Sequence, residues 1–335
     1  MVYDLIVIGG GAAGMMGAAI AIEGSIQSGR KLNVAIIERN NKLGRKVAIS
    51  GGGRCNVTTG IEDPKEILKR YPRGAKFLSY GMYEFGPAKV REWFNEHGLP
   101  TKVEEDLRVF PVSDHGEDVI EVYKKIFAQN NVEIMYGEIV KSVQKNNEEF
   151  VVELNTGKKI SSKNIVLASG GQAYRHTGSQ GDSYSFAQAL GHSITQLGPS
   201  LNSFLLRQPW VKSLAGVSFE KATLSSPLNK KYIFSGAFVF THRGISGPAV
   251  FAMSSLTAFE KYSPQAPMPL TIDFFPDSNN EQLLKKITEL ITAHPRKNFA
   301  NIIDMLLPKS MVEVVITQSH ADGQRDSAQV SKQTL

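Results

Sequence analysis

Strand-like and helix-like patterns of hydrophobic residues follow one another over the first 38 residues. Residues 3–8 form a short apolar run with β-branched content, and a glycine-rich turn leads directly into an Ala-rich stretch over 12–22 with helical character. A second buried-strand pattern over 33–37 ends at Glu38. The order strand, turn, helix, strand predicts a βαβ unit, and such units are typical of an α/β sheet with parallel strands and right-handed crossovers.

Further elements follow in the next 130 residues, where helical spacing and alternating apolar runs succeed one another. We expect helices over 63–69, 87–97 and 118–129, strands over 132–136 and 139–143, and a hairpin of 150–154 with 159–160. The apolar run 165–168 then enters a second glycine turn at Ser169-Gly170-Gly171. A strand that runs into such a turn indicates a return to the parallel sheet.

A change of texture near residue 195 indicates a second domain. Prolines punctuate short alternating runs from there on, which predicts mainly antiparallel β structure over 195–319, with helices over 281–293 and 299–307. Residues 1–194 then form a dinucleotide-binding, Rossmann-like α/β domain. Residues 320–335 are polar and free of aromatic side chains, so we expect a disordered tail.

Composition narrows the class of protein. The chain has 335 residues, 41% of them hydrophobic, which is enough for a globular core and for about two domains. The 38 basic and 32 acidic residues leave a net charge of +6, and most basic residues come as scattered pairs. The lack of a basic stripe argues against nucleic-acid binding.

The single cysteine, Cys55, has no disulfide partner within the chain, and the first residues lack the features of a secretory signal. Charged residues and glycines interrupt every hydrophobic run, so no membrane-spanning segment is expected. These features predict a cytoplasmic protein. The histidine spacing and the lone cysteine argue against a metal site, and the motifs of serine hydrolases and P-loop NTPases are missing.

The first glycine turn carries the spacing of a dinucleotide-binding fingerprint. Gly9-x-Gly11-x-x-Gly14 follows a predicted strand and opens a predicted helix, and Glu38 ends the next strand. In such a turn the second glycine lets the backbone approach a pyrophosphate, the helix N-terminus attracts the phosphates, and the acidic residue accepts the ribose hydroxyls. The alternative is a glycine-rich turn in an unrelated α/β protein. The fingerprint alone does not separate FAD from NAD.

Longer motifs decide between these cofactors, because they resemble a known family of flavoproteins, the NAD(P)/FAD-dependent oxidoreductases also described as aminoacetone oxidase family FAD-binding enzymes. The similar strings lie at residues 7–14, 43–46, 49–57, 108–111, 168–171, 177–182, 198–201 and 241–248. The resemblance implies an FAD domain interrupted by a β-rich domain, and an oxidoreductase that passes a hydride between the flavin and a small organic substrate or NAD(P)H.

The resemblance also implies which residues hold the cofactor. The ADP half is assigned to Gly9, Gly11, Ala12, Ala13, Gly14, Glu38, Arg39, Val140, Ser169 and Gly170. The pyrophosphate and flavin side is assigned to Lys46, Ser50, Gly51, Gly52, Gly53, Arg54, Cys55 and Asn56.

Three of the conspicuous side chains keep two interpretations. Arg54 is either a charge beside the flavin or a salt-bridged loop anchor. Cys55 without a second thiol fits a small packed residue better than a redox group. His242, in a glycine-bounded loop of the second domain, is either a general acid or substrate anchor, or a hydrogen-bonded loop histidine. Tyr174, Arg175 and His176, after the second glycine turn, are weaker candidates of the same kind.

One departure from the family pattern concerns the C-terminal end. After Gly247 the chain has one glycine, Gly323, whereas the resemblance implies a glycine-rich segment beside the FAD ribityl chain. We therefore expect this segment to be missing and FAD to bind weakly or not at all. The leading hypothesis is an FAD-dependent oxidoreductase; the alternatives are a non-catalytic nucleotide-binding or RNA-associated module, or an inactive flavoprotein.

Overall fold

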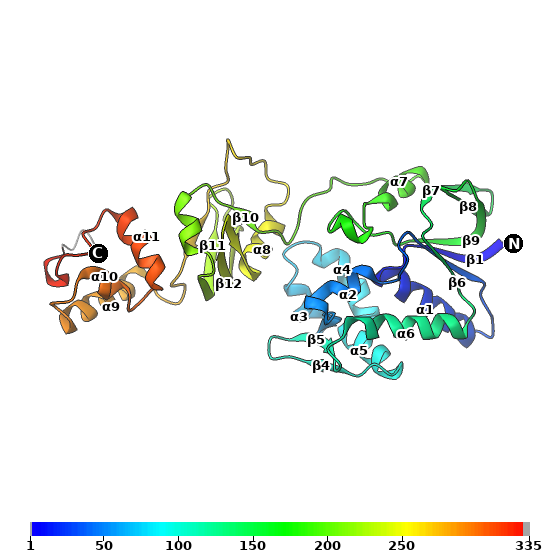
Figure 1. Ribbon diagram of the computed structural model, residues 1–335, viewed down its shortest axis with the longest axis horizontal. Helices are drawn as coiled ribbons and strands as arrows, with labels where there is room; N and C mark the ends of the chain where they lie inside the picture. Colours follow the sequence, from blue (N-terminus) through cyan, green and yellow to red (C-terminus); the bar gives the residue numbers. More distant parts are fainter. Residues whose placement is uncertain (1, 331–335) are drawn as a thin grey trace. The chain divides into compact units, whose positions relative to one another are not determined.

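A computed structural model describes residues 2–330 of the protein (Figure 1). The chain divides into two compact units, Met1–Gln196 and Leu197–Leu335. The first unit contains a six-stranded sheet and the second a five-stranded antiparallel sheet. The expected fold class, a Rossmann-like α/β domain followed by a mainly antiparallel β domain with helices, is confirmed.

The sheet of the first unit has the strand order β6-β2-β1-β9-β8-β7. Four strands pair in parallel, namely β6 (Glu133–Tyr136), β2 (Val34–Glu38), β1 (Val2–Ile8) and β9 (Lys159–Leu167). The hairpin partner β8 (Glu149–Leu154) and then β7 (Val140–Asn146) continue the sheet in antiparallel pairing. The parallel strands all end at one edge, and the βα turns meet there.

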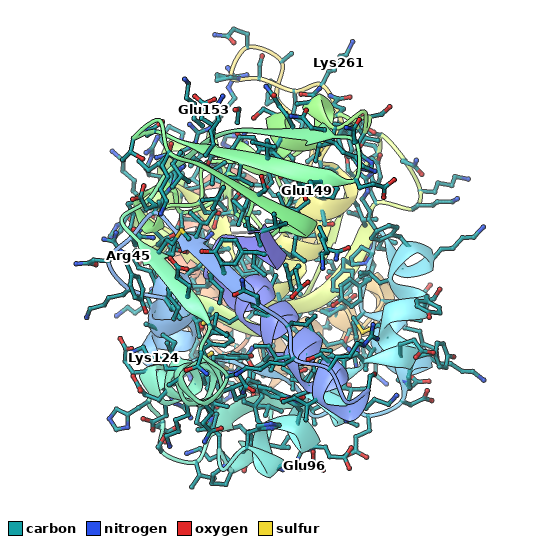
Figure 2. The ribbon with its side chains drawn as sticks, turned by 90° about the vertical axis from the view of Figure 1, so that its right-hand side faces the viewer. Arg45, Glu96, Lys124, Glu149, Glu153 and Lys261 are labelled. Carbon is teal, nitrogen blue, oxygen red and sulfur yellow. The ribbon has the colours of Figure 1, made fainter. Side chains whose placement is uncertain are left out.

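Apolar residues on alternate positions of β1 pack on both faces of this sheet. Leu5 and Val7 lie in one core cluster with α1 (Ala12–Gln27) and α6 (Gly116–Gln129), and Ile6 and Ile8 lie in another. Figure 2 shows α6, marked by Lys124, on one side of α1, and the β7–β8 strands, marked by Glu149 and Glu153, on the other. The buried central strand fixes the turn that follows it, because slipping the register by one residue would exchange the two faces.

Short elements inserted between β2 and α6 complete the first unit. A three-stranded sheet has the order β3-β5-β4. The inserted elements are α2 (Arg45–Ile49), η1 (Ser50–Gly53), β3 (Thr58–Thr59), α3 (Pro64–Lys69), α4 (Ala75–Glu84), α5 (Pro87–Glu96), β4 (Thr101–Val103) and β5 (Arg108–Pro111). After β9 come η2 (Arg175–Thr177) and α7 (Asp182–Ala189).

The second unit is built on the antiparallel sheet β10-β13-β12-β11-β14. Its strands are β10 (Phe204–Leu205), β11 (Ser218–Ser225), β12 (Ile233–Thr241), β13 (Gly244–Ser246) and β14 (Thr271–Asp273). Its helices are η3 (Pro209–Leu214), α8 (Pro248–Leu256), α9 (Asn280–Ala293), α10 (Phe299–Ile303) and α11 (Lys309–Ser319), with η4 (Ser327–Gln329). Aromatic side chains of β11 and β12 form much of its core.

Residues 320–330 differ from the disordered tail expected over 320–335. Ser327 is buried, its N–H donates to the Lys297 carbonyl and its hydroxyl donates to the His294 carbonyl. The N–H of Phe299 donates to the carbonyl of Arg325. These hydrogen bonds, together with Ala321 and Val330 packed against the cluster around Phe299, hold this segment to the α9–α10 region. Residues 331–335 lie outside the described residues.

No helix within residues 2–330 has the length and the apolar character needed to cross a lipid bilayer.

The phenol of Tyr3 makes the stability of the first unit depend on alkaline pH. Tyr3 on β1 donates a hydrogen bond to Glu133 on β6. Burial, and then this carboxylate, raise the pKa of Tyr3 from 10.0 to about 12. Tyr3 therefore keeps its phenol proton to a higher pH in the folded state than in the unfolded state. The contribution of the protonated phenol to the free energy of unfolding is complete below pH 10 and is lost as pH rises through 12.

We expect the substitution Tyr3→Phe to remove this dependence. Denaturant unfolding of the wild type and the variant at several pH values measures it. The difference between their free energies of unfolding should shrink between pH 10 and pH 12. A difference that stays constant over that range would contradict the assignment.

Candidate nucleotide-binding site

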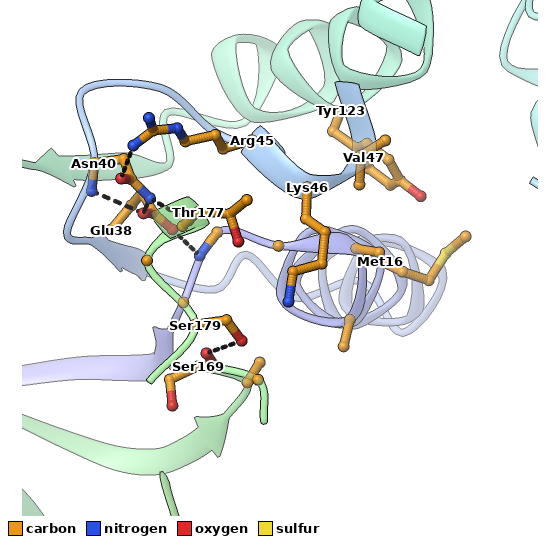
Figure 3. Close-up of a pocket in the computed structure, with 18 of the residues that line it drawn as sticks. Met16, Glu38, Asn40, Arg45, Lys46, Val47, Tyr123, Ser169, Thr177 and Ser179 are labelled. Atoms are coloured by element: carbon orange, nitrogen blue, oxygen red, sulfur yellow. Dashed lines mark hydrogen bonds between the residues drawn. The ribbon is translucent and has the colours of Figure 1, made fainter. Parts of the chain in front are cut away.

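A cavity of about 590 Å³ opens in the first unit where the parallel strands β1, β2 and β9 end. Its walls come from the β1–α1 turn, the end of β2, helix α2 and the loop after β9. Figure 3 shows Glu38, Asn40 and Arg45 at one end and Met16, Val47 and Tyr123 at the other. Pockets in α/β sheets form at this edge, where helix N-termini and strand ends converge.

The glycine turn is shaped by close approach of the backbone. A Cβ atom on Gly14 would lie 1.9 Å from the carbonyl oxygen of Gly9, so only glycine lets α1 pack against the turn. A Cβ atom on Gly11 would meet no atom within 4 Å, and Gly11 lines the cavity. The absence of a side chain at Gly11 therefore keeps space open for a ligand rather than for the protein itself.

The first turn of α1 leaves backbone donors available at this space. Gly11 is the N-cap and makes no side-chain capping bond, and the first turn holds no acidic residue. Nothing among residues 2–330 accepts a hydrogen bond from the N–H groups of Ala12 and Ala13, which both line the cavity. A 16-residue helix with free N–H groups and a partial positive charge at this end suits a phosphate.

Glu38 is buried at the end of β2 and held by three hydrogen bonds. Its Oε2 accepts from the N–H of Gly10 at 2.7 Å, and its Oε1 accepts from the backbone N–H of Asn40 at 2.8 Å and from the Asn40 amide at 2.6 Å. No lysine or arginine in the described part of the chain pairs with it. Because each carboxylate oxygen offers two lone pairs, Oε2 keeps acceptor capacity toward the cavity that Glu38 lines.

Two cations lie beside the glycine turn between β1 and α1, which we call the cradle. Within the part of the chain that the structure describes, neither has a carboxylate partner. Arg45 donates to Asn40 Oδ1 at 3.0 Å, and Lys46 Nζ donates to the carbonyl of Ala173 at 3.0 Å. A third cation, Arg39, is paired with Asp182 at 2.9 Å. The lining also carries three acidic side chains, Glu38, Glu138 and Asp182, so it has no net charge. The two cations without carboxylate partners among residues 2–330, Arg45 and Lys46, are the groups that would attract an anionic ligand such as a diphosphate.

The other end of the cavity is apolar. Its lining includes Met16, Val47, Val57, Val90, Phe94 and Val119. Tyr123, on α6, is 3% exposed and lines this end, and no group among residues 2–330 is hydrogen-bonded to its hydroxyl. Burial raises the pKa of Tyr123, so its phenol stays protonated and can donate a hydrogen bond at neutral pH.

Most residues expected to hold the cofactor line this cavity. They are Gly9, Gly11, Ala12, Ala13, Glu38, Arg39, Lys46, Ser50, Cys55, Asn56, Val140, Ser169 and Gly170. Gly14 lies behind the wall, and Gly51, Gly52, Gly53 and Arg54 lie outside the lining. Cys55 is a buried free thiol whose pKa is raised by burial, which favours the packed-residue interpretation.

Arg54 is engaged within the protein. Its guanidinium forms ion pairs with Glu104 and with Asp114, the latter at 2.7 Å, and lies 3.8 Å from the centre of the Phe110 ring. These contacts favour the loop-anchor interpretation of Arg54.

The other candidates from the sequence lie outside the lining. His242 is exposed in the β12–β13 turn of the second unit. Tyr174 is also exposed, and Arg175 donates to Gln172. Catalytic roles for these residues stay predictions.

The cavity also uses residues that the sequence did not single out as ligands. They are Asn40, Arg45, Thr177, Gly178, Ser179, Asp182, Phe186 and Tyr123, among others. Ser179 donates to the Gly171 carbonyl at 2.9 Å, and Asn40 donates to the Thr177 carbonyl at 3.1 Å. Residues 177–182 are one of the strings that resemble the flavoprotein family. That resemblance could have indicated that Thr177, Gly178, Ser179 and Asp182 line the cavity.

The parallel sheet, the glycine cradle and the carboxylate at the end of β2 together define a Rossmann-type dinucleotide-binding protein. The chain belongs to the family described as HI0933-like protein Rossmann domain, which matches residues 3–317. This membership confirms the resemblance found in the sequence and the expected class, flavin-dependent oxidoreductase.

Several named proteins are similar to this chain. A ribosomal RNA dihydrouridine synthase of Escherichia coli is 30% identical over 93% of this chain and 72% of its own length. A 3-dehydro-bile acid delta(4,6)-reductase of Clostridium scindens is 27% identical over 94% of this chain and 75% of its own. The solved structure of a 3-ketosteroid-delta4-(5alpha)-dehydrogenase from Rhodococcus jostii is 16% identical, covers 65% of this chain and 59% of that chain, and has a TM-score of 0.43.

Proposed function

We propose that the protein is an FAD-dependent reductase that adds hydrogen across a C=C bond conjugated to a carbonyl group. The observation that carries this proposal is the form of the cavity, which joins a dinucleotide cradle to an apolar chamber containing the unpartnered hydroxyl of Tyr123. Such a chamber accepts a flat, unsaturated substrate, and the hydroxyl supplies a polar contact for a carbonyl.

The residues present fit FAD. The free N–H groups of Ala12 and Ala13 and the ammonium of Lys46 would hold the pyrophosphate, and Glu38 Oε2 would accept from the ribose. The space in front of Gly11 is one that a Cβ atom would fill. A bound flavin supplies a hydride from its N5 atom, and NAD(P)H is the proposed reductant that restores it.

The names of the two relatives support the substrate class. Dihydrouridine is uridine with its ring C=C bond saturated, and a delta(4,6)-reductase saturates ring C=C bonds. In both names the reacting bond is conjugated with a carbonyl group of the ring system. Their substrates differ greatly in size and charge, so the shared chemistry is the part proposed for this chain.

Tyr123 is the residue proposed to stabilise the charge that develops on the substrate during the reduction. The substrate gains a hydride at one carbon of the C=C bond and a proton at the other, so a hydrogen-bond donor on the carbonyl stabilises the negative charge that develops there. Since the phenol is protonated at neutral pH, its O–H can donate to the carbonyl oxygen. Tyr123 holds its own proton at the substrate oxygen, and the proton that the second carbon gains is taken from solvent water.

We expect Tyr123→Phe to slow reoxidation of the reduced protein by an unsaturated ketone by roughly 100-fold, the range seen when an oxyanion donor is removed. The flavin content should be unchanged, since the hydroxyl lies at the apolar end of the cavity. Anaerobic stopped-flow absorbance with cyclohexenone measures the rate. Tyr136→Phe, which alters a partly exposed tyrosine of β6, is the control. Equal rates for the wild type and Tyr123→Phe would contradict the role of Tyr123.

The proposed function is tested with the protein reconstituted with FAD. NADH or NADPH added without oxygen should bleach the visible flavin band, and cyclohexenone or uridine should restore it. A band that neither nicotinamide changes, or that no unsaturated carbonyl compound restores, would overturn the proposal.

A further inference from the structure

Helix α4 exposes large aromatic side chains to solvent. Phe77 is 88% exposed, Tyr80 77% and Tyr83 52%, and no residue of the helix is buried. The three side chains recur every third residue, so they share one side of this ten-residue helix. Isolated exposed aromatics are common, but three neighbouring rings on a helix without a buried side indicate a binding surface.

Basic side chains accompany these rings. Between Lys65 and Lys89 the sequence has six lysines and arginines and two glutamates, a net charge of +4 in a chain whose total is +6. Lys65, Arg70 and Lys76 are exposed, and no carboxylate in the described part of the chain forms an ion pair with them. We call the set Tyr71, Phe77, Tyr80, Tyr83, Lys65, Arg70 and Lys76 the aromatic-basic surface.

The aromatic-basic surface leads to the cavity. Phe85 is the C-cap of α4 and lines the cavity, and Val90 and Phe94 of the following helix α5 line it as well. A chain molecule lying along α4 (Figure 1) would therefore reach the apolar chamber at the end of the helix.

We infer that the aromatic-basic surface binds single-stranded RNA and presents one unpaired base to the cavity. Exposed rings stack on bases without regard to sequence, and nearby cations neutralise phosphates, which together is how proteins hold single strands. An enzyme that acts on a base must accept it outside a stacked helix. The inference rests on the proposed function, because the C=C bond to be reduced is then that of a pyrimidine.

Charge and length favour RNA over a lipid surface. Helix α4 has ten residues, and its exposed side combines rings with Ser79, Gly81 and Lys76 instead of a continuous aliphatic stripe. The cavity beyond Phe85 is lined by apolar side chains such as Val90 and Phe94. Binding to a membrane would use the aromatic rings, but it would give no role to the connection between the aromatic-basic surface and the cavity.

The test is fluorescence anisotropy with a labelled uridine-rich 12-nucleotide RNA and the full chain, with FAD present. The double variant Phe77→Ala/Tyr80→Ala should weaken binding at least 10-fold, since each stacked ring contributes roughly 5- to 100-fold in affinity. Lys76→Gln should weaken binding and lower the slope of log K against log salt by about 0.7.

The matched control is Tyr136→Ala/Lys158→Gln, which removes one exposed ring and one exposed lysine elsewhere in the same unit. It should bind RNA like the wild type. Circular dichroism and melting curves should agree for all variants, because the altered side chains are exposed.

The inference is overturned if the wild-type chain does not bind the RNA or if the double variant binds it as tightly as the wild type. It is also overturned if the double variant instead loses binding to phosphatidylserine vesicles or loses self-association in sedimentation. Cyclohexenone reduction on the same samples separates the two proposals. If the protein reduces cyclohexenone but does not bind RNA, only the RNA-binding role of the aromatic-basic surface is rejected. If it binds RNA but does not reduce cyclohexenone, only the proposed reductase activity is rejected.

Discussion

Gly11→Ala is expected to weaken FAD binding by at least roughly 100-fold while the protein still folds. The new methyl group meets no protein atom but occupies the space in front of the first turn of α1. It would hold a phosphate away from the N–H groups of Ala12 and Ala13, and each charged hydrogen bond lost costs about 1.5–3 kcal/mol. Gly11 has φ −82° and ψ −174°, an extended conformation open to alanine, so the free energy of unfolding should change by about 1 kcal/mol or less.

Two neighbouring glycines of the same helix provide the comparison. In Gly14→Ala the Cβ atom would lie 1.9 Å from the Gly9 carbonyl oxygen, so the helix must shift and the protein should lose roughly 1–3 kcal/mol of stability together with FAD binding. In Gly17→Ala no atom lies within 4 Å of the added Cβ atom. The free energy of unfolding should therefore rise by about 0.5–1 kcal/mol, and FAD affinity should not change. Urea unfolding and calorimetric FAD titration measure both quantities. Normal FAD affinity in Gly11→Ala would show that the phosphates bind elsewhere.

Glu38→Gln should reduce FAD affinity by about 10- to 100-fold and also destabilise the apoprotein. The carboxylate accepts from Gly10 N–H, from Asn40 N–H and from the Asn40 amide. An amide in its place presents an NH₂ group to one of these donors, and leaving a buried donor unsatisfied costs about 1–3 kcal/mol. The ribose would lose its charged acceptor in addition.

Adenosine and FAD titrations of the same variant separate these effects. Both ligands should weaken by a similar factor, since Glu38 is expected at the ribose. The control is Glu149→Gln on β8, a carboxylate outside the cavity lining. A Glu38→Gln protein with unchanged adenosine affinity would remove Glu38 from the site.

The parts of the site that could be predicted from sequence are those set by local geometry. The Gly9, Gly11 and Gly14 spacing needs only one strand, one turn and one helix, and Glu38 needs only the end of the next strand. Here the hydrophobic pattern and the turn chemistry indicate the same structure. The antiparallel hairpin of β8 and β9 followed from the turn at 155–157 for the same reason.

The parts that could not be predicted depend on contacts between distant segments. Lys46 meets the Ala173 carbonyl, and Asn40 meets that of Thr177, across more than a hundred residues of sequence. The helix containing Tyr123 was expected, but nothing in the sequence shows that its hydroxyl lacks a partner. Pairing of this kind is fixed by the tertiary fold alone.

Helix α4 was missed for a different reason. A helix is recognised from sequence by apolar residues that face the core, and the aromatic side chains of α4 face solvent instead. Helix α11 was not predicted either, although Met311 and Val312 on it are buried. Helix α4 therefore lacks the pattern of core-facing apolar residues by which a helix is predicted, and we infer that its exposed rings serve binding instead of packing.

The three donors that hold the Glu38 carboxylate have a consequence for the free energy of binding. A side chain already fixed in one rotamer loses no further conformational freedom when a ligand arrives, which saves roughly 0.5–1.5 kcal/mol compared with a freely rotating glutamate. Recognition of the adenosine end is therefore preorganised. Binding of the adenosine end therefore needs no reordering of the Glu38 side chain.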